Sequence, residues 1–441
     1  MSAPARVTSV CEAEVSSSRG GLPIWLNLRT CLLLAAAARL SALLLLHNFT
    51  HPNFFEWGDI VRKYLAGRGF SYYTVNGVDV PTAYMPPAYS YILLVTFSVF
   101  GDRPFSYVLL QLMQAAAGVL LVYLIYRFTL VAWNEETALV AAAIAALYPP
   151  FVYMPVEMHS INFYIVLTVA VVYYLHLFLA GTPQRAYVVW TGLLLGGLIY
   201  FRAEALALPF LYAALLVFRD RQNWRAALVV VLLPLLLLAP LSIRNTRALG
   251  SVVVTTTAGG INLWYGHNPQ ANGTQHELWP SGQYVFPNAA LRERFHALPA
   301  TADYELRMSA IYREEALQFI RTHPKREVLL VLRKLFYFWT IDWNHPKARH
   351  AVYAVPTLAL VTLFWVGVAI HWKDLTGRYL VLTVTLVFTN LLAVIFFVLP
   401  RYRLGVEPLM VPFAASALLW AWRARPARRQ GAADIPRLAG K

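Results

Sequence analysis

Long apolar runs restrict what this chain can fold into more than any other feature. Residues 32–46, 229–241 and 380–398 contain one charged side chain between them, Arg39. A run of about 20 apolar residues is long enough to cross the roughly 30 Å hydrocarbon core of a bilayer. Only 13% of the 441 residues are charged, whereas soluble domains carry about 25%. The sequence therefore predicts a multi-pass membrane protein and excludes both a soluble globule and a disordered chain. Arg39, inside the first run, requires an internal partner or a water-filled cleft.

The apolar segments predict an all-α, polytopic transmembrane helical bundle of about ten spans. The expected spans are 25–46, 106–127, 137–154, 160–180, 186–201, 203–219, 226–243, 350–371, 378–399 and 405–422. Residues 89–100 are too short to cross, and 328–340 contain Arg333 and Lys334, so both are expected as juxtamembrane helices on the outer face. An even number of spans keeps the Arg-rich tail inside, as the positive-inside rule favours.

This topology divides the chain into a cytoplasmic segment 1–24, a transmembrane domain 25–422 and a basic cytoplasmic tail 423–441. Two long outer loops, 47–105 and 244–349, interrupt the transmembrane domain. Within the second loop, the spacing of Leu306, Ile311, Leu317 and Ile320 predicts an amphipathic helix over 304–321 that ends before Pro324.

The net charge of +15 raises the question of nucleic-acid binding. Much of this charge lies in short segments that flank the apolar runs, where charge sets membrane topology. Because no basic soluble domain is present, we expect membrane lipids and no nucleic acid as partners.

Two acidic residues stand out in the first outer loop. Glu56 and Asp59 lie three positions apart, so on a helix that stops at Gly67 they share one face. A carboxylate at this place is suited to act as a general base or to hold a metal ion. The same pair also fits a hydrated juxtamembrane helix whose acids balance Arg62 and Lys63.

Prolines and aromatic residues follow in the same loop. Pro81, Pro86 and Pro87 stiffen the approach to 89–100, and Tyr84 and Tyr89 lie among them. Such a surface suits the docking of a lipid-borne substrate, and it equally suits an ordinary aromatic belt at the membrane interface.

Four arginines interrupt or end apolar segments at one expected depth, near the outer face. They are Arg202, Arg244, Arg401 and Arg403. The guanidinium fork matches phosphate oxygens, so a phosphate on a membrane lipid is the expected partner. The alternative is that these arginines are snorkelling anchors.

Residues 255–273 form a loop rich in glycine and asparagine that contains His267 and Asn268. Its backbone amides and these side chains are candidates for substrate binding. Glu157 and His159, which follow Pro149 and Pro150, either face the same cavity or cap the start of a helix.

The ordered series of short motifs resembles the polytopic GT-C glycosyltransferases of the protein-mannosyltransferase and lipid A aminoarabinose-transferase group. The resemblance covers residues from about 30 to 415. Its pieces are Glu56 and Asp59 before Ala66-Gly67-Arg68-Gly69-Phe70, Pro81-Thr82-Ala83, Pro86-Pro87-Ala88-Tyr89, Phe201-Arg202-Ala203-Glu204, Ile243-Arg244-Asn245, 260–269 and Pro400-Arg401-Tyr402-Arg403.

This resemblance implies an enzyme of the bacterial inner membrane whose active site faces the periplasm or exterior. It would move a sugar, with inversion, from a polyprenyl-phosphate donor to a hydroxyl of a protein, lipopolysaccharide or other surface glycan. An acidic residue in the first outer loop would be the catalytic base, here Glu56 or Asp59. Arg202, Arg244 and Arg403 would bind the lipid phosphate. Members differ in their use of a divalent metal, so a metal cofactor stays open.

A secondary transporter or a flippase for a lipid-linked sugar is the competing function. It would use the same apolar composition, with Arg39, Arg202 and Glu204 along a pathway. The lack of inverted sequence repeats and the two long outer loops argue against it.

Overall fold

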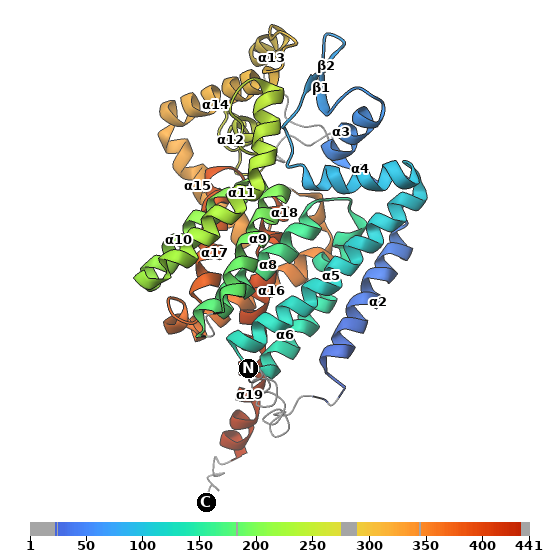
Figure 1. Ribbon diagram of the computed structural model, residues 1–441. Helices are drawn as coiled ribbons and strands as arrows, with labels where there is room; N and C mark the ends of the chain where they lie inside the picture. Colours follow the sequence, from blue (N-terminus) through green and yellow to red (C-terminus); the bar gives the residue numbers. More distant parts are fainter. Residues whose placement is uncertain (1–22, 24, 182–183, 275–288, 344, 434–441) are drawn as a thin grey trace, which may run out of the picture.

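A bundle of helices carries a smaller outer layer at one end (Figure 1). This computed structural model describes residues 23, 25–181, 184–274, 289–343 and 345–433. Apart from residue 23, the expected segment 1–24 lies outside the described residues, as does 434–441, the end of the expected tail. Helix α2 begins and helix α19 ends at the same lower end of the bundle (Figure 1), as an even number of crossings requires.

Every expected span is helical. The bundle contains α2 (Leu28–Leu46), α5 (Pro104–Ala132), α6 (Glu135–Leu147), α7 (Pro149–Tyr153), η1 (Met154–Val156), α8 (Ile161–Leu179), α9 (Arg185–Phe201), η2 (Ala203–Ala207), α10 (Leu208–Arg219), η3 (Arg221–Asn223), α11 (Trp224–Leu249), α16 (Ala351–Ile370), η5 (Trp372–Asp374), α17 (Leu380–Ile395) and α19 (Glu407–Ala433).

Fewer helices than ten are long and apolar enough to cross a bilayer by themselves. Within the described residues five are: α2, α5, α8, α16, and α11 together with η3. A sixth results if α6 and the segment Pro149–Val156, which meet at 53°, count as one broken span. Helices α9 and α17 are apolar but shorter. The expected turn at Arg202 and Glu204 is confirmed, because η2 separates α9 from α10 there.

The outer layer is built from the two long loops. It contains α3 (Phe55–Leu65), β1 (Ser71–Val75), β2 (Val78–Pro81), α4 (Ala88–Phe100), α12 (Gly259–Gly266), α13 (Ala289–His296), α14 (Tyr304–Thr322), α15 (Pro324–Trp339) and η4 (Pro346–Arg349), and α18 (Pro400–Leu404) precedes α19. Helix α4 runs crosswise over the bundle (Figure 1). At 13 residues it is about 20 Å long, too short to cross the hydrocarbon core.

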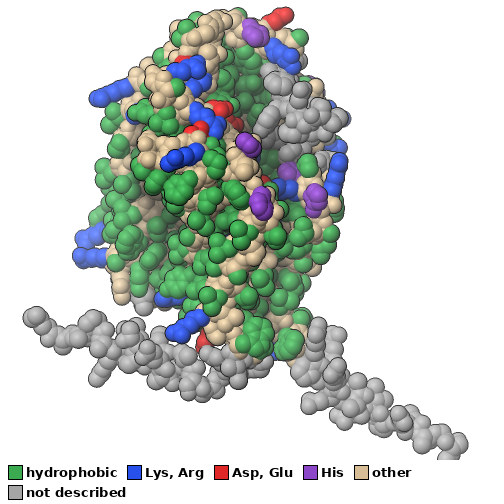
Figure 2. Space-filling view, turned by 90° about the vertical axis from the view of Figure 1, so that its right-hand side faces the viewer, with side chains coloured by type: hydrophobic (Ala, Val, Ile, Leu, Met, Phe, Trp, Pro, Cys, Tyr) green, Lys and Arg blue, Asp and Glu red, His purple; other side chains and the backbone are tan. Residues whose placement is uncertain are grey.

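Apolar side chains dominate the middle of the molecule, and cationic side chains gather toward its upper part and lower edge (Figure 2). This banding is what a bilayer-spanning protein requires, because charged groups are costly at the centre of the hydrocarbon. With the apolar helices, it identifies the chain as an integral membrane protein.

Small residues let the bundle helices approach closely. Five alanines of α6 are buried: Ala138, Ala141, Ala142, Ala145 and Ala146. Helix α6 packs against α2, α5 and α19. Without a hydrophobic driving force between helices in lipid, such close packing is what holds them together.

Arg39 finds its partners at the end of α6. Its side chain is fully buried, and its terminal nitrogens donate to the carbonyl oxygens of Ala35, Ala146 and Ala145 at 3.0, 3.2 and 3.4 Å. The last carbonyls of a helix lack partners within that helix, and the helix dipole favours a cation there. Arg39 therefore caps α6 where the chain breaks before Pro149, and it holds α2 against α6.

The amphipathic helix expected over 304–321 is confirmed as α14, and its expected apolar face is confirmed in part, because Leu306 and Ile311 are partly buried against the core. The buried face consists of Tyr304, Glu305, Met308, Tyr312, Ala316 and Phe319, whereas Leu317 is exposed. Tyr312 packs against α12, with 5.3 Å between its ring centroid and that of Trp264, and Tyr304 packs against Tyr73 of β1. Aromatic side chains therefore make up much of the buried face of this helix, beside the aliphatic ones that the spacing indicated.

A two-stranded antiparallel hairpin is an addition to the all-α expectation. Strands β1 and β2 pair across a two-residue turn at Asn76 and Gly77, both with positive φ, which is the preferred hairpin sequence. Lys63 of α3 donates to Asp79 at 2.9 Å and to Thr74 at 2.7 Å. These bonds fasten the hairpin to α3.

Gly118 of α5 provides the space that Arg39 occupies. A β-carbon at this position would lie 2.4 Å from Arg39 Nε. We therefore expect Gly118→Ala to displace Arg39 and to destabilise the protein by about 1–3 kcal/mol, the range for overpacking. Gly197→Ala is the matched control, because its nearest atom, Leu167 Cδ1, lies 3.7 Å away. Thermal midpoints in detergent measure the difference, and equal midpoints for the two variants would contradict this assignment.

Candidate active site

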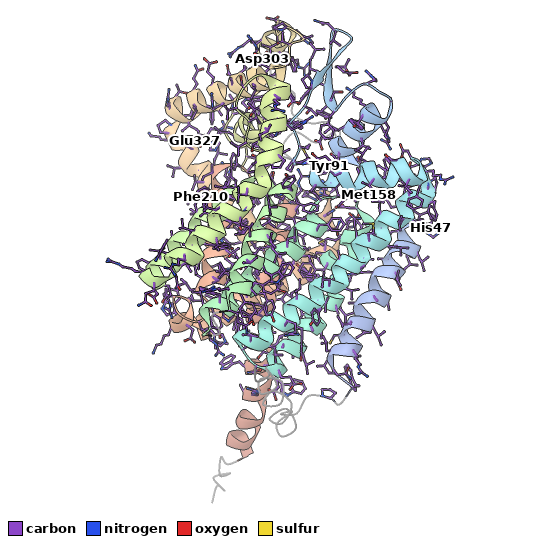
Figure 3. The ribbon with its side chains drawn as sticks, viewed as in Figure 1. His47, Tyr91, Met158, Phe210, Asp303 and Glu327 are labelled. Carbon is purple, nitrogen blue, oxygen red and sulfur yellow. The ribbon has the colours of Figure 1, made fainter. Side chains whose placement is uncertain are left out.

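A cavity of about 690 Å³ is lined by residues of both layers. Its lining comes from the start of α3, residues 84–86, His159, the turn between α9 and α10, residues 255–265, the end of α17 and residues 401–402. Phe210 of α10 lines it from the bundle and lies below Asp303 and Glu327 of the outer layer (Figure 3). The cavity thus lies where apolar helices meet the polar outer loops.

Glu56 lines this cavity, whereas Asp59 does not. Both lie on α3, with Glu56 in its first turn, where the helix dipole favours an anion. Trp57 is buried and donates from its indole nitrogen to Pro86 O at 3.1 Å, which fixes the start of α3 against the proline-rich loop. Asp59 lies on the exposed side of the helix. The structure therefore separates the two acids that their spacing had placed on one face.

Arg202 also lines the cavity. It ends α9 in an extended conformation, and its Nε donates to Glu204 at 2.7 Å. Its guanidinium carbon lies 5.5 Å from the ring centre of Tyr164 and 5.1 Å from that of Tyr402. One edge of the fork is thus tied to Glu204 while two aromatic rings hold its plane.

Arg401 and Arg403 lie on α18 but have different surroundings. Arg401 lines the cavity and lies 5.8 Å from the ring centre of Tyr402. Arg403 is buried; it donates to Glu407 at 2.8 Å, to Thr340 O, and to Tyr353 Oη at 3.3 Å. These partners engage the whole Arg403 guanidinium within the protein, and it is absent from the described lining.

Arg244 also lies outside the described lining. It donates to Thr82 O at 2.7 Å and to Asn245 Oδ1 at 2.9 Å, and its guanidinium carbon lies 4.6 Å from the ring centre of Phe70. Arg244 therefore joins the end of α11 to the first outer loop.

The expected substrate-binding residues are also divided. Tyr84 lines the cavity and stacks on Tyr72 at 5.3 Å. Tyr89 is buried on α4, where its hydroxyl contacts Gln114 Oε1 at 3.2 Å. Asn268 is buried and donates to Trp264 O at 2.8 Å. Neither Tyr89 nor Asn268 belongs to the described lining.

His267 lies in a separate buried cluster outside that lining. Its ring nitrogens lie 2.7 Å from Glu327 Oε2 and 2.7 Å from Ile395 O, and Lys334 Nζ lies 3.1 Å from Nε2. Lys334 also donates to Val394 O at 3.0 Å. The cluster therefore supplies partners to the last carbonyls of α17, which no helical bond satisfies.

Glu305 holds two walls of the cavity together, a role that the sequence analysis did not anticipate. The buried carboxylate accepts hydrogen bonds from Thr82 Oγ1, from Ala83 N at 2.9 Å and from Thr257 Oγ1 at 2.8 Å. Burial raises the pKa of Glu305, while these bonds and the charge of Arg244 oppose the shift. In the sequence, Glu305 is marked only by its position next to Tyr304. Its role can be recognised only when the buried face of α14 is known.

The described residues do not form a metal site. They contain no group of three or more His, Cys, Asp or Glu side chains placed to hold an ion. Two acids, Glu157 and Glu204, are engaged in ion pairs: Glu157 accepts from Lys347 at 2.6 Å, and Glu204 pairs with Arg202. Within the part of the chain that the structure describes, the donor set therefore does not fit a divalent cation.

Comparisons with known proteins identify similar sequences and folds. Residues 84–243, about a third of the chain, match the family model of dolichyl-phosphate-mannose-protein mannosyltransferases. No curated protein sequence matches. Among solved structures, the chain is similar to the oligosaccharyltransferase of Archaeoglobus fulgidus in complex with zinc and sulfate, at 13% identity and a TM-score of 0.53, covering 90% of this chain and 50% of that one.

Two further structures are similar. AglB of Archaeoglobus fulgidus, in complex with an inhibitory peptide and a dolichol-phosphate, has 14% identity and a TM-score of 0.53, covering 94% of this chain and 52% of that one. ArnT of Cupriavidus metallidurans, bound to undecaprenyl phosphate, has 16% identity and a TM-score of 0.39, covering 87% and 77%. The chain spans about half the length of the oligosaccharyltransferase, whose fold its helices share.

Removing the Glu305 carboxylate should loosen both loops at once. In Glu305→Ala the buried donors of Thr82, Ala83 and Thr257 lose their acceptor, which costs about 1–3 kcal/mol for each unpaired group. We expect faster amide hydrogen exchange in residues 82–86 and 255–260 together, and a smaller effect in Glu305→Gln, which keeps one acceptor oxygen. Glu314→Ala, at an exposed position of the same helix, is the control. Faster exchange confined to α14 would contradict the conclusion that Glu305 holds the two loops together.

Proposed function

We propose, from the premise that this chain is a GT-C superfamily protein, that it moves a sugar from a polyprenyl-phosphate donor to an acceptor hydroxyl. The proposed location is the bacterial inner membrane, with the active site facing the periplasm or exterior. The acceptor belongs to a protein, to lipopolysaccharide or to another surface glycan. Transfer proceeds with inversion at the sugar carbon.

The observation that carries this proposal is the lining of one cavity by two arginines and two acids, of which Glu204 pairs with Arg202. Glu56 comes from the first outer loop, Arg202 from the end of α9, and Arg401 from the segment before α19. Leu392 and Phe396, at the end of α17, and Phe210 of α10 add apolar walls. Such a cavity suits a ligand with a charged head and an apolar tail.

The arginines support departure of the donor phosphate. The phosphate leaves with its lipid as the bond from its oxygen to the sugar carbon breaks, and negative charge grows on that oxygen. The leaving group is already ionised, so it needs cations rather than an acid. Arg202, held by Glu204 and two tyrosine rings, and Arg401 are preorganised donors of this kind, which act strongly in a water-poor site.

Glu56 supports attack by the acceptor. Its carboxylate takes the hydroxyl proton while the acceptor oxygen forms the new bond to the sugar carbon from the opposite side. Asp59, outside the cavity, is not assigned this step. Arg244 and Arg403, whose partners are internal, are assigned to positioning the outer loop and α18 rather than to the phosphate.

Glu56→Gln should slow transfer by at least about a hundredfold, the lower range for loss of a general base, while donor binding is retained. The assay measures label moved from radiolabelled polyprenyl-phosphate sugars to an acceptor by the protein in vesicles. Asp59→Asn is the control and should keep near-normal rates. A slow Asp59→Asn with a normal Glu56→Gln would move the base to Asp59. Label that only crosses the bilayer would identify a transporter or flippase instead.

Arg202→Ala and Arg401→Ala should each weaken donor binding or slow single-turnover transfer by about tenfold or more, because each removes a charge-assisted hydrogen bond to phosphate. Arg313→Ala, at an exposed position of α14, should leave both quantities unchanged. Unchanged donor affinity and transfer rate in both variants would indicate that these arginines are membrane anchors instead.

A further inference from the structure

His159 lies in the short connection between η1 and α8 and lines the cavity that holds Glu56. Only 5% of the residue is exposed. A histidine at this place has four possible roles: helix cap, base, metal ligand or hydrogen-bond donor. Its contacts separate these roles.

The backbone determines which ring nitrogen carries the proton. The amide N–H of Ile161, at the start of α8, donates to His159 Nδ1 at 3.0 Å. An amide nitrogen cannot accept, so Nδ1 must be the unprotonated nitrogen of the ring. The neutral imidazole then carries its proton on Nε2. In the described part of the chain, Nε2 has no hydrogen-bond partner from the protein.

Aromatic packing keeps the ring from turning over. The rings of Phe55 and Trp57 meet the imidazole edge to face, with centroid distances of 5.5 and 5.0 Å. Trp57 is in turn fixed by its bond to Pro86 O. The start of α3, which carries Glu56, therefore also sets the orientation of the His159 ring.

The surrounding charges oppose a second proton. Burial lowers the pKa of His159 well below its usual value, and the nearby Arg401, Arg202 and Lys347 lower it further. A ring that stays neutral, with Nδ1 already engaged, is neither a cationic partner for phosphate nor a ligand through Nδ1.

We infer that His159 binds the substrate through Nε2–H, as a neutral donor to an oxygen of the lipid-linked phosphate beside Arg202 and Arg401. This inference rests on the proposed function. It assigns Glu56, not His159, to proton removal, because an Nε2–H group cannot accept a proton. One nitrogen of the ring, Nδ1, thus caps α8, while the other, Nε2, contacts the substrate.

Two substitutions separate these two ends. In His159→Asn the side-chain oxygen can still accept from Ile161 N–H, as Nδ1 does, but the cavity donor is lost. In His159→Gln the longer amide can place an N–H near the position of Nε2, but the cap is weakened. The probe is undecaprenyl phosphate, titrated onto the full-length protein in detergent, with His296→Gln on exposed α13 as control.

We expect His159→Asn to weaken binding of undecaprenyl phosphate by about tenfold or more with an unchanged thermal midpoint, since a bond to a charged group is lost. His159→Gln should bind within about threefold of wild type although its midpoint falls. Equal affinity of His159→Asn and wild type would overturn the inference, as would affinity that depends on added zinc or manganese in wild type but not in His159→Asn.

A readout that does not involve the ligand tests the same ring. In nitrogen NMR of histidine-labelled protein, the signal that disappears in His159→Asn identifies His159. We expect the chemical shifts of this signal to indicate a proton on Nε2 and to stay constant between pH 5 and pH 8. A proton on Nδ1, or titration in this range, would also overturn the inference. Failure of wild type itself to bind undecaprenyl phosphate would instead overturn the proposed function.

Discussion

Charged groups inside this protein obey one constraint: within hydrocarbon, each needs a partner supplied by the protein or a polar cavity. Arg39 meets it with the terminal carbonyls of α6, and Lys334 does the same for α17. Arg403 meets it with Glu407 and Tyr353. Arg202, which pairs with Glu204, and Arg401 meet it at the wall of a cavity that Glu56 also lines. Cations whose partners are helix ends or internal acids are thus distinguished from the two arginines that line the cavity.

Much of the fold could be predicted from the sequence because length and apolarity act locally. Each expected span is helical, and the break at Arg202 and Glu204 separates α9 from α10. The hairpin was not expected, although Asn76 and Gly77 between Val75 and Val78 form a strong turn signal. The face of α14 was readable only in part, because Met308 and Tyr312 are buried in a cluster with Ile261 and Trp264 of α12, which is distant in sequence.

The candidate site was less predictable for the same reason. Arg401 and Arg403 are two positions apart, and on a short helix this spacing turns one into the cavity and the other into the protein. Which of them faces the cavity depends on the packing of α18, not on residue type. Glu56 and Asp59 diverge in the same way on α3. Glu305 and the tyrosines that hold Arg202 act through contacts between segments that no local pattern links.

The carboxylate of Glu305 bonds to segments near residues 82 and 257, which lie on opposite sides of several membrane spans in the sequence. Two walls of the cavity are consequently coupled in their motion, so neither can drift while the other stays. The shape of the cavity therefore depends on α14, a helix that contributes no residue to the described lining. Substitutions in this helix can thus reshape the cavity without changing the residues that line it.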